Sequence, residues 1–129
     1  MIKQVFDIES YWKVIVIWSI DYNFFDEVAL EMRMISISED VINEVWKTLS
    51  SREAQAVTCN NIQQHISIII FNTHTSEADY INSIVHEATH VMQAMLKGYN
   101  IDNEGEPPAY TIGYIVMKMY EVFRKFIQK

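Results

Sequence analysis

Hydrophobic and polar positions alternate along this chain in a way that separates predicted strands from predicted helices. Weak alternation of apolar and polar residues fits a strand at 2–8, and a run rich in β-branched and aromatic residues predicts a second strand at 12–20. The stretch 66–71 is a short, continuously apolar run with three consecutive isoleucines, which predicts a buried strand. The stretch 54–60 fits either a strand or part of a helix, and we favour the strand.

Apolar residues with a helical spacing, together with helix-end signals, predict helices over 38–51, 76–98 and 107–126. Ser38 and Ser76 are the expected N-caps, because their side chains can accept hydrogen bonds from backbone N–H groups. Gly98 marks the end of the middle helix, and Pro107-Pro108 suits the first turn of the last one. The segment 22–34 is ambiguous, although its apolar residues also have a helical spacing.

The size and composition of the chain indicate one α+β domain over residues 1–129. Half of the 129 residues are hydrophobic, which is enough for a single core. The formal net charge is −7. An acidic surface repels nucleic acid, so we expect no nucleic-acid partner.

Nothing in the sequence pattern predicts a secreted or membrane-bound protein. Lys3 is the only early positive charge, and the apolar run Val14–Trp18 is too short for a signal sequence or a membrane span. The single cysteine, Cys59, excludes an internal disulfide and a thiolate metal cluster, and we expect it to be a small buried residue. We therefore expect the chain to start at or near Met1, to stay in the cytoplasm and to have no membrane partner.

The most informative motif is His86-Glu87-Ala88-Thr89-His90, which lies within the predicted helix 76–98. Residues four apart share a helix face, so two imidazoles at this spacing can reach one Zn²⁺. The glutamate projects to the flank of the metal, where it can take a proton from a metal-bound water rather than act as a ligand. This is the H-E-x-x-H arrangement of zinc metallopeptidases.

The helix around this motif favours metal binding over a chance occurrence. Wound at about 100° per residue, the segment has one apolar stripe and one polar stripe on opposite faces. The apolar stripe comprises Ile81, Ile84, Ala88, Val91, Met92 and Met95, and the polar stripe comprises Asp79, Asn82, His86, His90, Gln93 and Lys97. The two histidines are therefore expected to project away from the core, where a ligand role is open to them.

The motif helix and the segment that follows it resemble the glutamate-type zincins, also called gluzincins. In that family of zinc metallopeptidases, a Glu followed three residues later by a small residue on a second helix completes the zinc shell. Glu106-Pro107-Pro108-Ala109-Tyr110 is similar to that motif. The resemblance implies that Glu106 is the third ligand. Glu104, two residues earlier, is the competing candidate, and either Glu can instead be a favourable charge at a helix N-terminus.

The resemblance covers about residues 66–126 and points to small members of the family, often phage- or prophage-encoded. It implies a minimal zincin-like fold, in which a small N-terminal sheet accompanies the motif helix and a long C-terminal helix. It also implies that the strand at 66–71 borders the cleft, where an extended peptide could add to it. For a phage-encoded protein the expected compartment is the cytoplasm of the host cell.

These features predict zinc-dependent hydrolysis of peptide bonds, with zinc held by His86, His90 and Glu106 and with Glu87 as the general base. A peptide or protein would be the substrate. One alternative is a non-catalytic regulatory or interaction protein that binds zinc on a zincin scaffold. A second alternative is a hydrolase of non-peptide amides with the same site.

Three further residues are candidates for contacts with a substrate or transition state. His74 could stabilise an oxyanion or bind substrate, although we expect a solvated loop residue. The hydroxyl groups of Tyr110 and Tyr114 could donate to a tetrahedral intermediate. For both tyrosines we favour ordinary amphipathic packing with the hydroxyl at the surface.

Overall fold

The computed structural model describes residues 2–9 and 11–127, with side chains as far as residue 125, and is built around one mixed sheet. Within these residues the strands are β1 (Ile2–Ile8), β2 (Trp12–Trp18), β3 (Ala56–Asn61) and β4 (Ile66–Phe71). Their order in the sheet is β1-β2-β4-β3. The central pair β2 and β4 is parallel, whereas β1 and β3 pair antiparallel with their neighbours and form the two edges.

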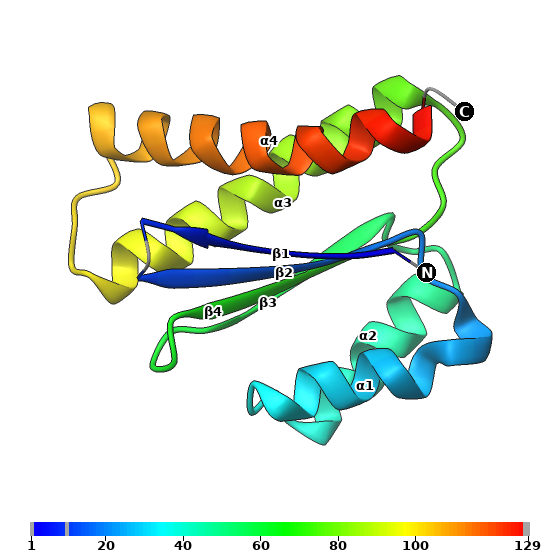
Figure 1. The fold of residues 1–129 in the computed structure, drawn as a ribbon. Helices are drawn as coiled ribbons and strands as arrows, with labels where there is room; N and C mark the ends of the chain where they lie inside the picture. Colours follow the sequence, from blue (N-terminus) through cyan, green and yellow to red (C-terminus); the bar gives the residue numbers. More distant parts are fainter. Residues whose placement is uncertain (1, 10, 128–129) are drawn as a thin grey trace.

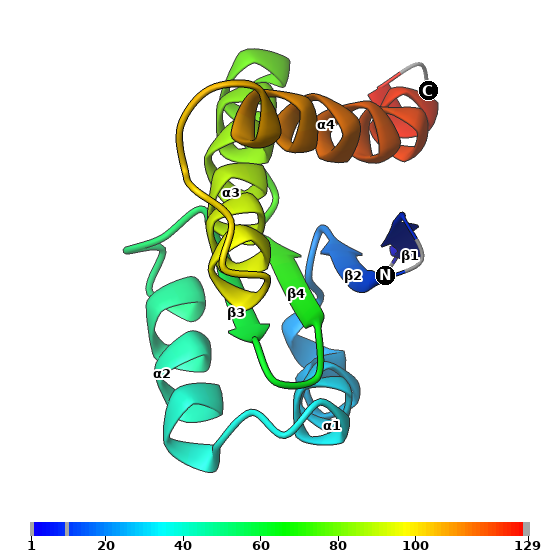
Figure 2. The ribbon, with the colours of Figure 1, turned by 90° about the vertical axis from the view of Figure 1, so that its left-hand side faces the viewer.

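Helices cover both faces of this sheet. The short 3-10 helix η1 (Tyr22–Phe24) leads into α1 (Phe25–Met34), and the other helices are α2 (Glu39–Ser50), α3 (Glu77–Gly98) and α4 (Glu106–Ile127). Figure 1 shows α3 and α4 on one face of the sheet and α1 and α2 on the other. In the turned view of Figure 2, α3 lies over β3 and β4, and α4 lies toward β1 and β2. None of the described helices is long and apolar enough to cross a membrane.

The structure confirms the α+β class, the strand at 54–60 and the helix starts expected from the sequence. Ser38 caps α2 by accepting a hydrogen bond from the Val41 N–H, at 3.3 Å. Ser76 caps α3 by accepting one from the Asp79 N–H, at 3.1 Å. These caps satisfy backbone donors that have no partner within the helix. The Ser76 cap fixes where α3 begins, and with it the direction in which the histidine motif points.

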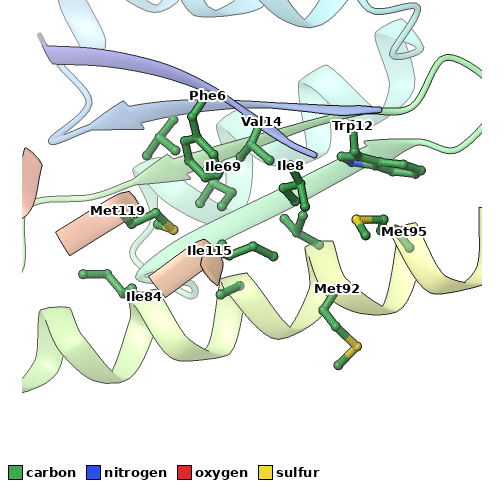
Figure 3. Close-up of a cluster of buried hydrophobic side chains, with 14 of the residues drawn as sticks. Phe6, Ile8, Trp12, Val14, Ile69, Ile84, Met92, Met95, Ile115 and Met119 are labelled. Carbon is green, nitrogen blue, oxygen red and sulfur yellow. The ribbon is translucent and has the colours of Figure 1, made fainter. Parts of the chain in front are cut away.

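The two central strands supply both hydrophobic cores because successive side chains of a strand point to opposite faces. Trp12, Val14, Val16 and Trp18 of β2 pack toward α3 and α4, while Ile15 and Ile17 pack toward α1 and α2. Figure 3 shows the first of these cores, in which Val14 and Ile69 of the sheet lie across from Ile84 and Met95 of α3 and Ile115 and Met119 of α4. Burial on both faces explains why β2 and β4 are apolar over most of their length.

Two side-chain contacts fasten α4 along β1. The Gln4 side-chain amide donates to the Lys118 carbonyl at 2.7 Å, and the Tyr114 hydroxyl donates to the Asp7 carbonyl at 3.2 Å. Both contacts join β1 to α4, so α4 is held near one edge of the sheet. The opposite edge, β3, lies beside α3.

Candidate metal centre

The motif helix α3 presents His86 and His90 together on its exposed face. Their Nε2 atoms are 3.2 Å apart, and their ring planes meet at 79°. Two nitrogens that bind one tetrahedral Zn²⁺ at about 2.0–2.1 Å lie roughly 3.4 Å from each other. The spacing of the two imidazoles therefore fits a shared metal ion.

Glu87 lies beside this pair but is buried, with 4% of its surface exposed. Its Oε1 accepts a hydrogen bond from the Thr58 hydroxyl of β3 at 3.1 Å, and its Oε2 lies 4.0 Å from His86 Nε2. Burial raises the pKa of the Glu87 carboxyl, and the Thr58 hydrogen bond and the two histidines oppose that rise. A carboxylate with a raised pKa is a better proton acceptor than an exposed one.

His86, Glu87 and His90 each offer a ligand atom, and these three atoms lie within 4.8 Å of one another. Among the described residues they form the candidate metal cluster. Neutral imidazole nitrogens and a carboxylate oxygen are donors that zinc accepts, although they also suit other divalent transition metals. The geometry thus supports a metal site, and the choice of zinc rests on the motif.

The cluster opens into a cleft of about 510 Å³ between α3 and β3. One wall comes from β3 and the loop before it, and the other comes from α3. The lining residues are Ala54, Gln55, Ala56, Val57, Thr58, Asn60, Asn82, Ser83, His86, Glu87 and His90. The two exposed histidines and the buried glutamate thus face a space that a substrate can enter.

The strand that borders this cleft differs from the one expected. The family resemblance implied that the strand at 66–71 borders the cleft. That segment forms β4, which is hydrogen-bonded to β2 on one side and to β3 on the other. Its continuous apolar run is buried on both faces of the sheet, which is the reason it lies inside. The edge beside the histidines is β3 (Ala56–Asn61).

The acidic residues proposed as third ligand lie elsewhere. Glu106 is the first residue of α4 and is exposed, as is Glu104. Pro107, next to Glu106, lines a separate cavity with Ile8 and Leu96, on the side of β1. Neither acidic residue belongs to the metal cluster or to the lining of the cleft. The arrangement does not bring Glu106 to the histidines, and its role as a ligand stays a prediction.

Tyr110 and Tyr114 also lie away from the cleft. Both line the cavity near β1, and Tyr110 is 65% exposed. The Tyr114 hydroxyl is already bonded to the Asp7 carbonyl. The structure therefore does not bring either hydroxyl together with the candidate metal cluster.

His74, by contrast, is tied to the cleft. It is half-buried rather than solvated, and its Nε2 lies 2.7 Å from the hydroxyl of Ser83, which is a lining residue. Its ring also stacks on Tyr80, with centroids 4.2 Å apart. His74 thus contacts the polar wall of the cleft through Ser83, without lining the cleft itself.

Cys59 is half-buried on β3, where it packs toward the core beneath α1 and α2. Burial, together with the nearby charge of Glu87, raises the pKa of the Cys59 thiol to about 11. The thiol is therefore protonated at neutral pH and is not a ready metal ligand.

Sequence reasoning missed two polar residues of this site, Thr58 and Ser83. Ser83 stands one turn before His86, so the helical spacing alone could have placed it on the same face. Thr58 could be found only after β3 was known to be the edge beside α3, because its contact with Glu87 joins two distant segments. Its position alternates with Val57 and Cys59, which face the other side of the sheet.

No protein-family model, curated protein or solved structure matched this chain in the comparisons.

Proposed function

We propose that this protein is a zinc-dependent hydrolase of peptide bonds with a zincin-like active site. The observation that carries the proposal is the arrangement of His86, Glu87 and His90, whose ligand atoms lie within 4.8 Å at the wall of an accessible cleft. Two exposed imidazoles suit metal binding, and a buried carboxylate beside them suits proton transfer. The resemblance of the motif to the gluzincins supports the same interpretation.

In this proposal His86 and His90 hold the zinc through their Nε2 atoms, which are already 3.2 Å apart. A zinc ion, when bound, supplies a Lewis acid that polarises a carbonyl group and lowers the pKa of water. His86 and His90 are both exposed, so the ion can reach them from solvent.

Glu87 is the general base. Its carboxylate takes a proton from the attacking water and passes that proton to the leaving amine of the substrate. The Thr58 hydroxyl holds Oε1 and leaves Oε2 on the side of His86. Burial raises the pKa of Glu87, which favours the first of these proton transfers.

The proposed substrate is an extended peptide segment. β3 pairs with β4 through one edge, and within the described residues no strand pairs with its other edge. A peptide can add to such an edge through main-chain hydrogen bonds. Its scissile bond would then run along the cleft wall that carries Thr58, opposite the two histidines.

One observation favours a second candidate, a non-catalytic zinc-binding regulatory or interaction protein. Catalytic zinc sites usually have three protein ligands, and neither Glu106 nor Glu104 belongs to the described cluster. A site with two histidines and no third protein ligand would bind zinc more weakly. Partner binding at the same edge of β3 would then replace hydrolysis.

The deciding experiment is a cleavage assay on a diverse peptide library with the zinc-loaded protein. Glu87→Gln is the matched control, because it keeps the shape and the Thr58 acceptor but removes the base. Cuts made by the wild type, and absent with Glu87→Gln or with chelator, would support peptide hydrolysis. A zinc-loaded wild type that cuts nothing in the library would contradict the proposal. A parallel panel of small amides would identify a hydrolase of non-peptide amides.

A further inference from the structure

The hydroxyl of Ser83 is paired with an imidazole whose proton position is determined by its other contact. His74 Nδ1 lies 2.8 Å from the backbone carbonyl oxygen of Asn72. A carbonyl oxygen can only accept, so Nδ1 of the neutral ring carries the proton and Nε2 is the free base. Ser83 Oγ, 2.7 Å from Nε2, therefore donates its proton toward His74.

Other hydroxyl groups inside the helices of this protein form a different hydrogen bond. Thr48, Thr89 and Thr111 each donate to the carbonyl four residues earlier, which is the common arrangement in a helix. Thr89 lies on the same helix as Ser83. The Ser83 hydroxyl instead points out of its helix to a histidine on the preceding loop.

The base is held rigidly. The ring of His74 stacks on Tyr80 at 22°, with centroids 4.2 Å apart, and it also lies 6.1 Å from the ring of Phe71. The Asn72 carbonyl fixes its tautomer, as described above. A nucleophile, a base within hydrogen-bond reach and a group that orients the base form the pattern of an activated nucleophile.

The residue that carries this hydroxyl borders the cleft. Ser83 is half-buried and lines the cleft, whereas His74 is not a lining residue. Gln55 and Asn82, which carry side-chain amides, line the same cleft. Such amides can donate hydrogen bonds to an oxyanion that forms on an acyl or phosphonyl group.

We infer that Ser83 is a nucleophile, with His74 as its general base, and that it accepts acyl or phosphonyl groups from activated esters. In acyl transfer, Ser83 Oγ bonds to the carbonyl carbon while its proton moves to His74 Nε2. The bond from that carbon to the leaving alkoxide then breaks, and the alkoxide takes the proton from His74. Water then attacks the carbonyl carbon of the acyl-serine and gives its proton to His74 Nε2. Ser83 Oγ leaves that carbon and takes the proton from His74. This activity needs no metal and goes beyond the proposed peptide hydrolysis.

The test is labelling of the chelator-treated, metal-free protein with a fluorophosphonate probe. Attack by Ser83 Oγ forms the O–P bond, breaks the P–F bond and releases fluoride, with the serine proton transferred to His74. Intact mass and peptide mapping are expected to show one adduct per chain, located at Ser83. Ser50 is an internal reference, because it is exposed and its hydroxyl pairs with the Lys47 carbonyl rather than with a histidine.

Two variants separate nucleophile from base. Ser83→Ala should fold normally, since alanine favours helices, and should lose the adduct. His74→Phe keeps a ring to stack on Tyr80 but has no nitrogen, and it should slow labelling of Ser83 about 10²–10⁴-fold. If His74→Phe fails to fold, His74→Asn retains a donor for the Asn72 carbonyl and takes its place. Labelling of Ser83 no faster than that of Ser50, or unchanged by loss of the His74 imidazole, would overturn the inference.

Discussion

Thr58 and Glu87 are joined across 3.1 Å by a hydrogen bond from the threonine hydroxyl to the carboxylate, and this bond links the edge strand to the motif helix. The Glu87 carboxylate accepts this bond while it is enclosed by the helix and the sheet. Glu87, the proposed base, and the proposed substrate-binding strand are thus held in one fixed relation. Substitutions at either end should reveal how much that relation matters.

Thr58→Val should destabilise the metal-free protein. Valine matches threonine in shape and also suits a strand, so the main change is a lost donor to a buried carboxylate. We expect a loss of about 1–3 kcal/mol in the free energy of unfolding, measured by urea denaturation. Thr58→Ser keeps the hydroxyl and should lose less. Equal losses in the two variants would mean that packing of the methyl group, and not the hydrogen bond, is what Thr58 contributes.

The protein should bind about one zinc per chain. Binding to the folded state alone raises stability, by about 2.7 kcal/mol at a free zinc concentration 100-fold above the dissociation constant. Elemental analysis after dialysis and thermal unfolding with and without chelator would measure both effects. His86→Ala and His90→Ala should each abolish the zinc-dependent rise. A rise that survives in both variants would locate the metal elsewhere.

Glu106→Ala distinguishes the ligand set implied by the family resemblance from the one found in the cluster. Glu106 opens α4 outside the cleft. We therefore expect Glu106→Ala and Glu104→Ala to leave zinc affinity within about threefold of the wild type, which corresponds to at most about 0.65 kcal/mol. Isothermal titration with zinc would measure it. A large loss in Glu106→Ala alone would show that the start of α4 reaches the metal in the bound protein.

The pH dependence of stability should report the burial of Glu87. Its folded pKa is raised above the ordinary 4.5, so the unfolded chain loses this proton first as pH rises. The wild-type metal-free protein should therefore lose stability relative to Glu87→Gln between about pH 4.5 and the raised folded pKa. At neutral pH the Gln variant should therefore be the more stable of the two proteins. If the stability of the wild type relative to Glu87→Gln instead increased with rising pH, the direction of the pKa shift would be contradicted.

The strands and helix starts were predictable because their signals are local. Ser38 and Ser76 act as caps through contacts with residues three positions later. The exposed face of α2 was harder to assign. The helical spacing of Val41, Val45, Trp46 and Leu49 predicts that these residues face the core. In the structure Val41 and Trp46 are 43% and 40% exposed, and Ile42 is buried instead. The sheet selects which residues of a short helix it covers, and a helical period alone leaves that choice open.

In the candidate site, too, the features set by local spacing were predictable and those set by long-range pairing were not. His86, Glu87 and His90 come together through the geometry of one helix, so their spacing was enough to predict the cluster. The identity of the bordering strand depends on the sheet order, which is set by pairing between distant segments. The same holds for the start of α4, because the path of a loop decides where Glu106 lies. Such long-range relations leave no periodic trace in a sequence.

All residues that line the cleft fall between Ala54 and His90, on a hairpin and the helix that follows it. The sheet beneath them needs β2 to pair in parallel with β4, which brings Lys13 beside Ile66. Loop-closure entropy opposes contacts between distant segments more than contacts between near ones. During folding we therefore expect the walls of the cleft to meet early, from neighbouring parts of the chain. The pairing of β2 with β4, which also brings β1 into the sheet, would then be the slow step that completes the sheet beneath the cleft.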